Sequence, residues 1–174
     1  MTEPKEQPQP QPQPEPQPQP QPQPLPLPLP RDIKPLVANR CTVWFDEFDK
    51  LGVLHNARYA IHVERAVSLF FASIYGTADP ADLHFLVKQY GIEFVRPFTR
   101  HLGELTVELW MERLGTTSAV FGFRCVSDGT AESAAVAPTE VEHARGTRTV
   151  VRVDPATNRP SPWSDAFREL FPAG

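Results

Sequence analysis

Alternation of apolar and polar residues along the chain predicts five β-strands, because successive side chains of a strand point to opposite faces of the sheet. In the clearest stretch, residues 104–113, Leu105 and Val107 share one face and the polar residues between them occupy the other. The expected strands cover residues 37–48, 85–95, 104–113, 118–126 and 141–153. Turn residues separate several of these stretches, so the later strands are expected to form an antiparallel meander.

A pattern with the period of an α-helix lies between the first two strands. Its apolar residues recur at helical spacing and form one stripe. The stripe consists of Tyr59, Ala60, Val63, Val67, Phe70, Phe71 and Ile74. The pattern predicts a helix that begins at Asn56 or Ala57 and ends near Tyr75, where Gly76 is a natural stop. A stripe so rich in large apolar residues predicts a mostly buried helix, and a helix with a meander is an α+β arrangement.

Composition changes this picture at the N-terminal end of the chain. Residues 7–30 are almost entirely Gln-Pro and Leu-Pro repeats. Proline lacks the amide donor and has a fixed φ, so a proline at every second position prevents both helix and sheet. We therefore expect a disordered, solvated tail over residues 1–33 and one folded domain over residues 34–174, which has an ordinary domain size. A short helix is expected near the end of that domain, over residues 164–171.

Charge, hydropathy and cysteine content exclude several classes of protein. The formal net charge is −4 and no basic block is present, so a nucleic-acid partner is not expected. The chain contains no apolar run of about 20 residues, so no membrane span is expected. Prolines interrupt the leucines near the N-terminus, which argues against a signal peptide and for the cytoplasm. Cys41 and Cys125 lie in strand-like segments without metal-ligand spacing, so we interpret them as free thiols in a reducing compartment.

The segment between the first strand and the helix carries the candidate chemistry. It contains Asp49, then Gly52, which permits a tight loop, and it reaches the expected helix start at Asn56. The first amides of a helix lack partners within the helix and carry partial positive charge, which suits a developing oxyanion. A carboxylate and an oxyanion site that face each other are the smallest set of groups that can hydrolyse an activated ester. An aspartate near a glycine is also a common turn residue, and Asp46 is an alternative carboxylate.

This segment resembles the motif of the 4-hydroxybenzoyl-CoA thioesterase family, whose members are acyl-CoA thioesterases with the hotdog fold. The matching positions are Asp49, Gly52, Tyr59 and Glu64, followed in order by residues 91–97, 103–107, 112–118 and 149–155. The resemblance covers roughly residues 37–171. It implies the hotdog fold, in which an antiparallel sheet of about five strands wraps around one long central helix. The chain departs from the family at residues 131–139, which read as an extra loop of small residues.

The resemblance also implies roles for individual residues. Asp49 would either attack the thioester carbonyl or activate a water that does, and the sequence does not separate these routes. The backbone N–H of Asn56 would be the oxyanion donor, although Asn56 also suits a helix cap. His55 stands where related enzymes often have Asn, Tyr or another aromatic residue, so its role comes from its own chemistry. It would position water or protonate the leaving thiolate, or it is a hydrogen-bonded loop residue. Glu64 would take a direct catalytic part, or it anchors the Asp49 loop through a hydrogen bond.

Further residues are candidates for holding the substrate. Gly52 would let the loop approach the acyl group, and Tyr59 would form a wall of the pocket. The candidates for contacts with the phosphates of coenzyme A are Arg113, Thr116, Thr117, Arg145 and Arg148, each of which also suits a solvated surface. The remaining histidines have no partner at metal-ligand spacing and are expected on the surface; these are His62, His84, His101 and His143.

We therefore expect an enzyme, a thioesterase that hydrolyses an acyl-CoA or an acyl-carrier-protein thioester to a free acid and a thiol. It should need no metal and no other cofactor, because a thioester is already activated. Hotdog pockets lie between protomers, so the resemblance implies a homodimer or a homotetramer. Two alternatives stay open: a hotdog dehydratase, whose His-containing motif is not found in this chain, and a non-catalytic module that binds acyl thioesters. The acyl chain preference also stays open.

Overall fold

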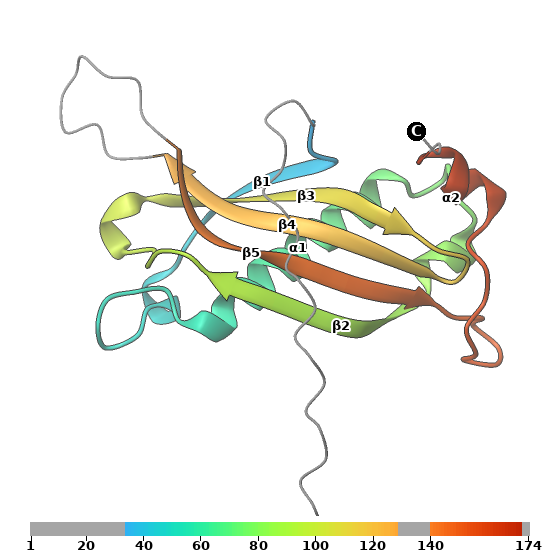
Figure 1. The fold of residues 1–174 in the computed structure, drawn as a ribbon, viewed down its shortest axis with the longest axis horizontal. Helices are drawn as coiled ribbons and strands as arrows, with labels where there is room; N and C mark the ends of the chain where they lie inside the picture. The colour runs from blue at the N-terminus through green and yellow to red at the C-terminus, as the bar shows by residue number, and fades with distance from the viewer. Residues whose placement is uncertain (1–33, 129–139, 172–174) are drawn as a thin grey trace, which may run out of the picture.

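The computed structural model describes residues 34–128 and 140–171, which form a five-stranded antiparallel sheet with a long helix packed on one face (Figure 1). The strands are β1 (Val37–Thr42), β2 (Phe85–Phe94), β3 (Glu104–Leu114), β4 (Ser118–Asp128) and β5 (Glu140–Arg152). Their order in the sheet is β1-β3-β4-β5-β2, so β1 and β2 are the two edges. The expected α+β architecture is confirmed. The predicted tail over residues 1–33 and the predicted loop over residues 131–139 lie outside the described residues.

The long helix, α1 (Asn56–Ser73), covers the sheet from behind in Figure 1. His55 caps its first turn, and Gly76, with a φ of 85°, follows its end in the left-handed region that favours glycine. The predicted apolar stripe is buried against the inward residues of β3, β4 and β5, and each large side chain there contributes about 1.5–3 kcal/mol. Within the described residues, no helix is long and apolar enough to cross a membrane.

The first strand is shorter than the sequence pattern predicts. It ends at Thr42, and a short 3-10 turn (Phe45–Glu47) follows. The turn forms because the carboxylate of Glu47 accepts a hydrogen bond from the backbone N–H of Trp44 at 2.9 Å. The chain therefore leaves the sheet early and reaches α1 through a compact loop that contains Asp49.

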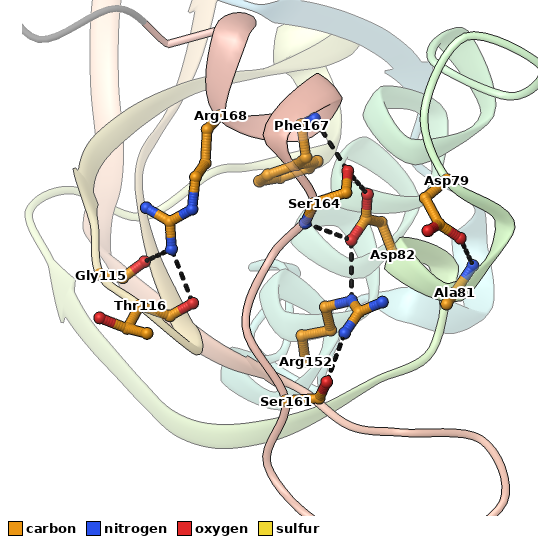
Figure 2. Close-up of polar contacts among 10 residues, drawn as sticks. All are labelled: Asp79, Ala81, Asp82, Gly115, Thr116, Arg152, Ser161, Ser164, Phe167 and Arg168. Carbon is orange, nitrogen blue, oxygen red and sulfur yellow. Dashed lines mark hydrogen bonds and ion pairs between the residues drawn. The ribbon is translucent and has the colours of Figure 1, made fainter.

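The C-terminal segment packs on the end of α1 that lies farthest from this loop (Figure 1), and Figure 2 shows its polar contacts. The carboxylate of Asp82 is fully buried, pairs with Arg152 at 2.8 Å, and accepts a 2.5 Å hydrogen bond from the hydroxyl of Ser164. Ser164 also caps the short helix α2 (Asp165–Glu169). The ring of Phe167 in α2 stacks on Phe71 near the end of α1, with a centroid separation of 6.1 Å. Polar and aromatic contacts thus fix this end of the fold.

Two of the four histidines expected on the surface are buried, so that prediction is wrong for them. His62 on α1 and His143 on β5 are 0% and 1% exposed, whereas His84 and His101 are exposed. His143 is accommodated because Ser127 lies 2.8 Å from its Nε2 and the carbonyl of Arg96 lies 3.3 Å from its Nδ1. Burial lowers the pKa of both buried histidines. The interpretation of the cysteines as free thiols is confirmed for Cys41 and Cys125.

Candidate active site

A pocket of about 420 Å³ lies at the N-terminal end of α1. The Asp49 loop, the first turn of α1 and the end of β2 with the loop after it form its walls. The lining residues are Asp49, Val53, Leu54, His55, Asn56, Tyr59, Phe94, Val95, Arg96 and Pro97. Most of these side chains are apolar, and Asp49 is the one carboxylate among them. The fold therefore brings the predicted carboxylate and the predicted helix start to the same cavity.

Backbone amides of its own loop hold the carboxylate of Asp49. Its Oδ1 accepts hydrogen bonds from the N–H of Leu51 at 2.8 Å and of Val53 at 3.3 Å. The loop is closed by a hydrogen bond from the N–H of Gly52 to the Asp49 carbonyl, and Gly52 has a φ of 74°. Within the described residues, Oδ2 of Asp49 has no protein donor. One oxygen thus orients the carboxylate and leaves the other free for chemistry.

The first turn of α1 supplies the opposite side of the pocket. His55 is the cap residue, and its Nδ1 accepts a hydrogen bond from the N–H of Ala57 at 3.2 Å. A neutral His55 therefore carries its proton on Nε2. Asn56 is the first helical residue, and in residues 34–128 and 140–171 no acceptor pairs with its backbone N–H. This amide is a free donor at the positive end of the helix dipole.

Aromatic residues form the apolar part of the pocket. Tyr59 is 2% exposed, and its ring meets that of Phe94 edge-on at a centroid separation of 5.4 Å. Burial raises the pKa of Tyr59 to about 12, so its phenol is neutral at physiological pH. Phe94 and Val95 remain 48% and 42% exposed at the edge of the sheet, where they border the mouth of the pocket.

Glu64 does not lie in the pocket lining, although it follows Asn56 by two helical turns. Its carboxylate, about half exposed, pairs with the guanidinium of Arg148, which β5 directs toward α1 and which is 3% exposed. The ion pair that the structure places at Glu64 is therefore with the sheet and not with the Asp49 loop. Arg148 is held in that internal pair because a buried guanidinium requires a carboxylate partner.

The other candidates for phosphate contacts do not line the pocket. Thr116 is in the β3–β4 turn, where its carbonyl accepts hydrogen bonds from the backbone N–H of Trp163 and from the side chain of Arg168 in α2. Figure 2 shows the contact with Arg168. Arg113 and Thr117 flank that turn. The turn lies near the C-terminal end of α1, which is about 27 Å long and begins at Asn56. Arg145 on β5 pairs with Glu93 at 2.8 Å and with Glu142 at 3.5 Å. The phosphate-binding role of these residues stays a prediction.

Sequence reasoning missed two arginines that the structure places near Asp49. Arg96 lines the main pocket, and Arg100 borders a second hollow of about 410 Å³ that shares Asp49 with it. The guanidinium of Arg100 covers Gly52, where an added Cβ would lie 3.1 Å from its Nη2. Phe45 forms another wall of this hollow and is 87% exposed. Both arginines flank Pro97 in the loop after β2, and no spacing in the sequence connects that loop with Asp49.

The model of the thioesterase-like superfamily matches residues 43–171, which include the whole pocket. The chain belongs to the thioesterase-like superfamily. The suspected resemblance is thereby confirmed, and this chain is a thioesterase by family. No curated protein matches it. Within the described residues of this thioesterase, no three His, Cys, Asp or Glu side chains are arranged to hold a metal ion.

Solved structures similar to this thioesterase establish the hotdog fold. The PA2801 protein of Pseudomonas aeruginosa is 24% identical, has a TM-score of 0.62, and aligns over 80% of this chain and 100% of its own. A thioesterase of Thermus thermophilus complexed with coenzyme A and Zn is 24% identical, with a TM-score of 0.63 and coverage of 78% and 90%. An acyl-CoA hydrolase of Staphylococcus aureus in complex with butyryl coenzyme A is 12% identical, with a TM-score of 0.57 and 78% coverage of both chains.

Proposed function

We propose that this thioesterase hydrolyses an acyl thioester of coenzyme A, or of an acyl carrier protein, in the pocket between Asp49 and Asn56. The proposal rests on one observation. Among the residues that the structure describes, a carboxylate oxygen without a donor and a helix-start amide without an acceptor line the same cavity. A thioester carbonyl in this cavity would direct its oxygen to the amide and its carbon to the carboxylate or to a water held by it.

Two routes are chemically balanced in this site. In the first, Oδ2 of Asp49 attacks the carbonyl carbon and the C–S bond breaks. Water then hydrolyses the acyl-aspartate anhydride, which regenerates the Asp49 carboxylate and releases the proton that the thiolate takes up. In the second, Asp49 takes a proton from water, the hydroxide attacks, and the proton passes to the leaving thiolate. Both routes develop negative charge on the carbonyl oxygen, where the N–H of Asn56 stabilises it. The products are a free acid and a thiol in either case.

In this proposal, the two hollows around Asp49 bind different parts of the substrate. The apolar walls formed by Tyr59 and Phe94 would take the acyl group. Arg100, across Asp49 from that side, would take a phosphate of the leaving thiol's carrier. The coenzyme A bound in the Thermus and Staphylococcus relatives supports an acyl-CoA as the first substrate to test.

The same proposal includes a homodimer formed through the free edge of β2. This edge carries Leu86 and Val87, which are 59% and 51% exposed, and an unpaired apolar edge favours pairing with a second chain. The residues Phe94 and Val95 continue the edge into the pocket mouth, so a second protomer there would border the substrate. Light scattering on the full chain tests this: a monomer at micromolar concentration contradicts it, and a tetramer requires a further interface.

Thiol release from a panel of acyl-CoA esters is the experiment that tests the function. Turnover of at least one ester that Asp49→Asn abolishes, while coenzyme A still binds, supports a thioesterase with Asp49 at its centre. A wild-type chain that binds the esters without hydrolysing them would be a binding module. A product formed by loss of water from a hydroxyacyl ester would indicate a dehydratase.

A further inference from the structure

A row of three side chains, two of them buried and one half-buried, lies beneath the Asp49 loop and is separate from the pocket lining. Nε2 of His62 lies 3.2 Å from Oε1 of Glu47, and Nδ1 of the same ring lies 3.3 Å from Sγ of Cys41. Glu47 and His62 are 5% and 0% exposed. The three residues come from the 3-10 turn, from α1 and from β1, so the row connects three of the elements that meet around the Asp49 loop.

We propose that Glu47 and His62 are positioning residues, which hold the Asp49 loop on α1 so that the carboxylate faces the N–H of Asn56. This inference rests on the proposed function and names residues that the catalytic proposal does not use. Glu47 precedes Asp49 by two residues, and His62 lies in the second turn of the helix that Asn56 begins. A contact between them therefore fixes the two halves of the site relative to each other.

Glu47 joins both ends of the loop through three hydrogen bonds besides its contact with His62. Its Oε2 accepts from the N–H of Trp44 at 2.9 Å, and its own N–H donates to the Trp44 carbonyl at 3.0 Å. Its carbonyl accepts from the N–H of His55 at 2.9 Å, immediately before α1. One residue thus connects the exit from β1 with the entry to α1, and the loop that contains Asp49 is held between these points.

The protonation state of His62 agrees with a structural role for its contact with Glu47. Desolvation lowers the pKa of His62 against the opposing effect of Glu47, and Arg65 and Arg58 on α1 lower it further. A neutral ring with its proton on Nε2 faces the carboxylate of Glu47. Its Nδ1 lies 3.3 Å from Sγ of Cys41, whose thiol donates to the carbonyl of Leu105. A carboxylate as buried as Glu47 needs such donors, because an unpaired buried charge is strongly unfavourable.

The row is not a second catalytic site with Cys41 as its nucleophile. Burial raises the pKa of Cys41, whereas a nucleophilic cysteine has a lowered pKa. Its Sγ also lies 3.2 Å from the carbonyl of Leu105 in the neighbouring strand, and Cys41 lines neither hollow beside Asp49. The thiol of Cys41 therefore has a structural role beside the ring of His62.

The variants Glu47→Gln, Glu47→Ala and His62→Gln test the proposal, with Asp82→Asn as the matched control. Asp82 is also a buried, paired carboxylate, but it lies at the far end of α1. A misplacement of about 1 Å costs on the order of 10²-fold in rate. We expect kcat to fall about 100-fold in Glu47→Ala and about tenfold in Glu47→Gln and His62→Gln, with KM within about threefold. Asp82→Asn should lower Tm about as much as the Glu47 and His62 variants do, and it should leave kcat unchanged.

Hydrogen exchange of the full chain supplies a readout that does not depend on activity. The N–H groups of Leu51 and Val53 bind the carboxylate of Asp49, so their exchange should accelerate in the variants of Glu47 and His62 but not in Asp82→Asn. An unchanged exchange rate, or a kcat that falls equally in Asp82→Asn, overturns the inference. If no ester is hydrolysed by the wild-type chain, the proposed function fails, and the exchange rates alone decide about positioning. Glu47→Gln keeps the size and the acceptor at Trp44, so it is the variant expected to fold.

Discussion

Asp49 and Asn56 border the same cavity from two sides, one with a carboxylate oxygen and the other with a backbone N–H that no group in the described part of the chain binds. The short loop between them is closed by its own hydrogen bonds and held on α1 through Glu47. This relationship makes separable predictions for the carboxylate, the amide and the nearby arginine. A further prediction concerns the buried His143 on β5.

Asp49→Asn should lower kcat by about 10²–10⁴-fold, because an amide is neither the nucleophile nor the base that both routes require. Coenzyme A should still bind with nearly unchanged affinity, since the substitution preserves size. Steady-state thiol release and calorimetric titration of coenzyme A measure the two quantities. Asp46→Asn is the control, because Asp46 is an exposed carboxylate three positions earlier that lines neither hollow. A loss of activity in the Asp46 variant alone would reassign the catalytic carboxylate.

Asn56→Pro removes the proposed oxyanion donor without removing the helix. Proline is tolerated at the first helical position, and the ψ of 133° at His55 suits a residue that precedes proline. We expect kcat to fall about 10²–10³-fold with little change in Tm. Asn56→Ala keeps the backbone N–H and should keep most of the activity. Equal rates for the two variants would show that another group stabilises the oxyanion.

Arg100→Ala should raise KM for an acyl-CoA about tenfold, the cost of about 1.4 kcal/mol for one charge-assisted phosphate contact. It should leave KM unchanged for the same acyl group on N-acetylcysteamine, which has no phosphate. Arg113→Ala is the comparison, because the sequence assigned Arg113 to the phosphates and the structure places it beside the β3–β4 turn. If only the Arg113 variant raises KM for the acyl-CoA, the phosphates lie at that turn and not above Gly52.

The buried His143 should make the protein less stable at acidic pH. Its folded pKa is lowered from 6.5 by burial, so the unfolded chain binds the proton more tightly than the folded one. Its contribution to stability is complete above pH 6.5 and is lost as the pH falls through the folded pKa. Urea unfolding between pH 7.5 and pH 5 should show this loss, and His143→Gln should reduce it. His101→Gln, at an exposed position, should retain the wild-type pH dependence.

Local patterns along the chain predicted most of the fold. The starts and ends of α1 and of β2 to β5 agree with the expected ranges within a few residues, because each element has one face in the core and therefore a visible period. The prediction was wrong for the end of β1. The residues up to Phe48 have strand propensity, but the side chain of Glu47 bonds the backbone at Trp44 and turns the chain.

The candidate site was predicted where its residues are neighbours in sequence and missed where they are not. Asp49, Gly52, Asn56 and Tyr59 belong to one continuous motif, and the structure places all of them around one loop and one pocket. Arg100 reaches the same loop from after β2, and His62 was expected on the surface although it is buried against Glu47. Neither the contact of Arg100 with the Asp49 loop nor that of His62 with Glu47 has a spacing that a linear pattern can reveal.

The order of residues was enough to predict the α+β class and the long buried helix, because both depend on short-range periodicity. It also predicted that a carboxylate lies near a helix start, because a loop of a few residues connects the two. Only the folded chain decided that Glu64 pairs with Arg148, that Glu47 and His62 lie under the loop, and that Arg100 stands beside Asp49. Such contacts depend on which strands become neighbours and on which side chains lose water together. Those are properties of the packed core as a whole.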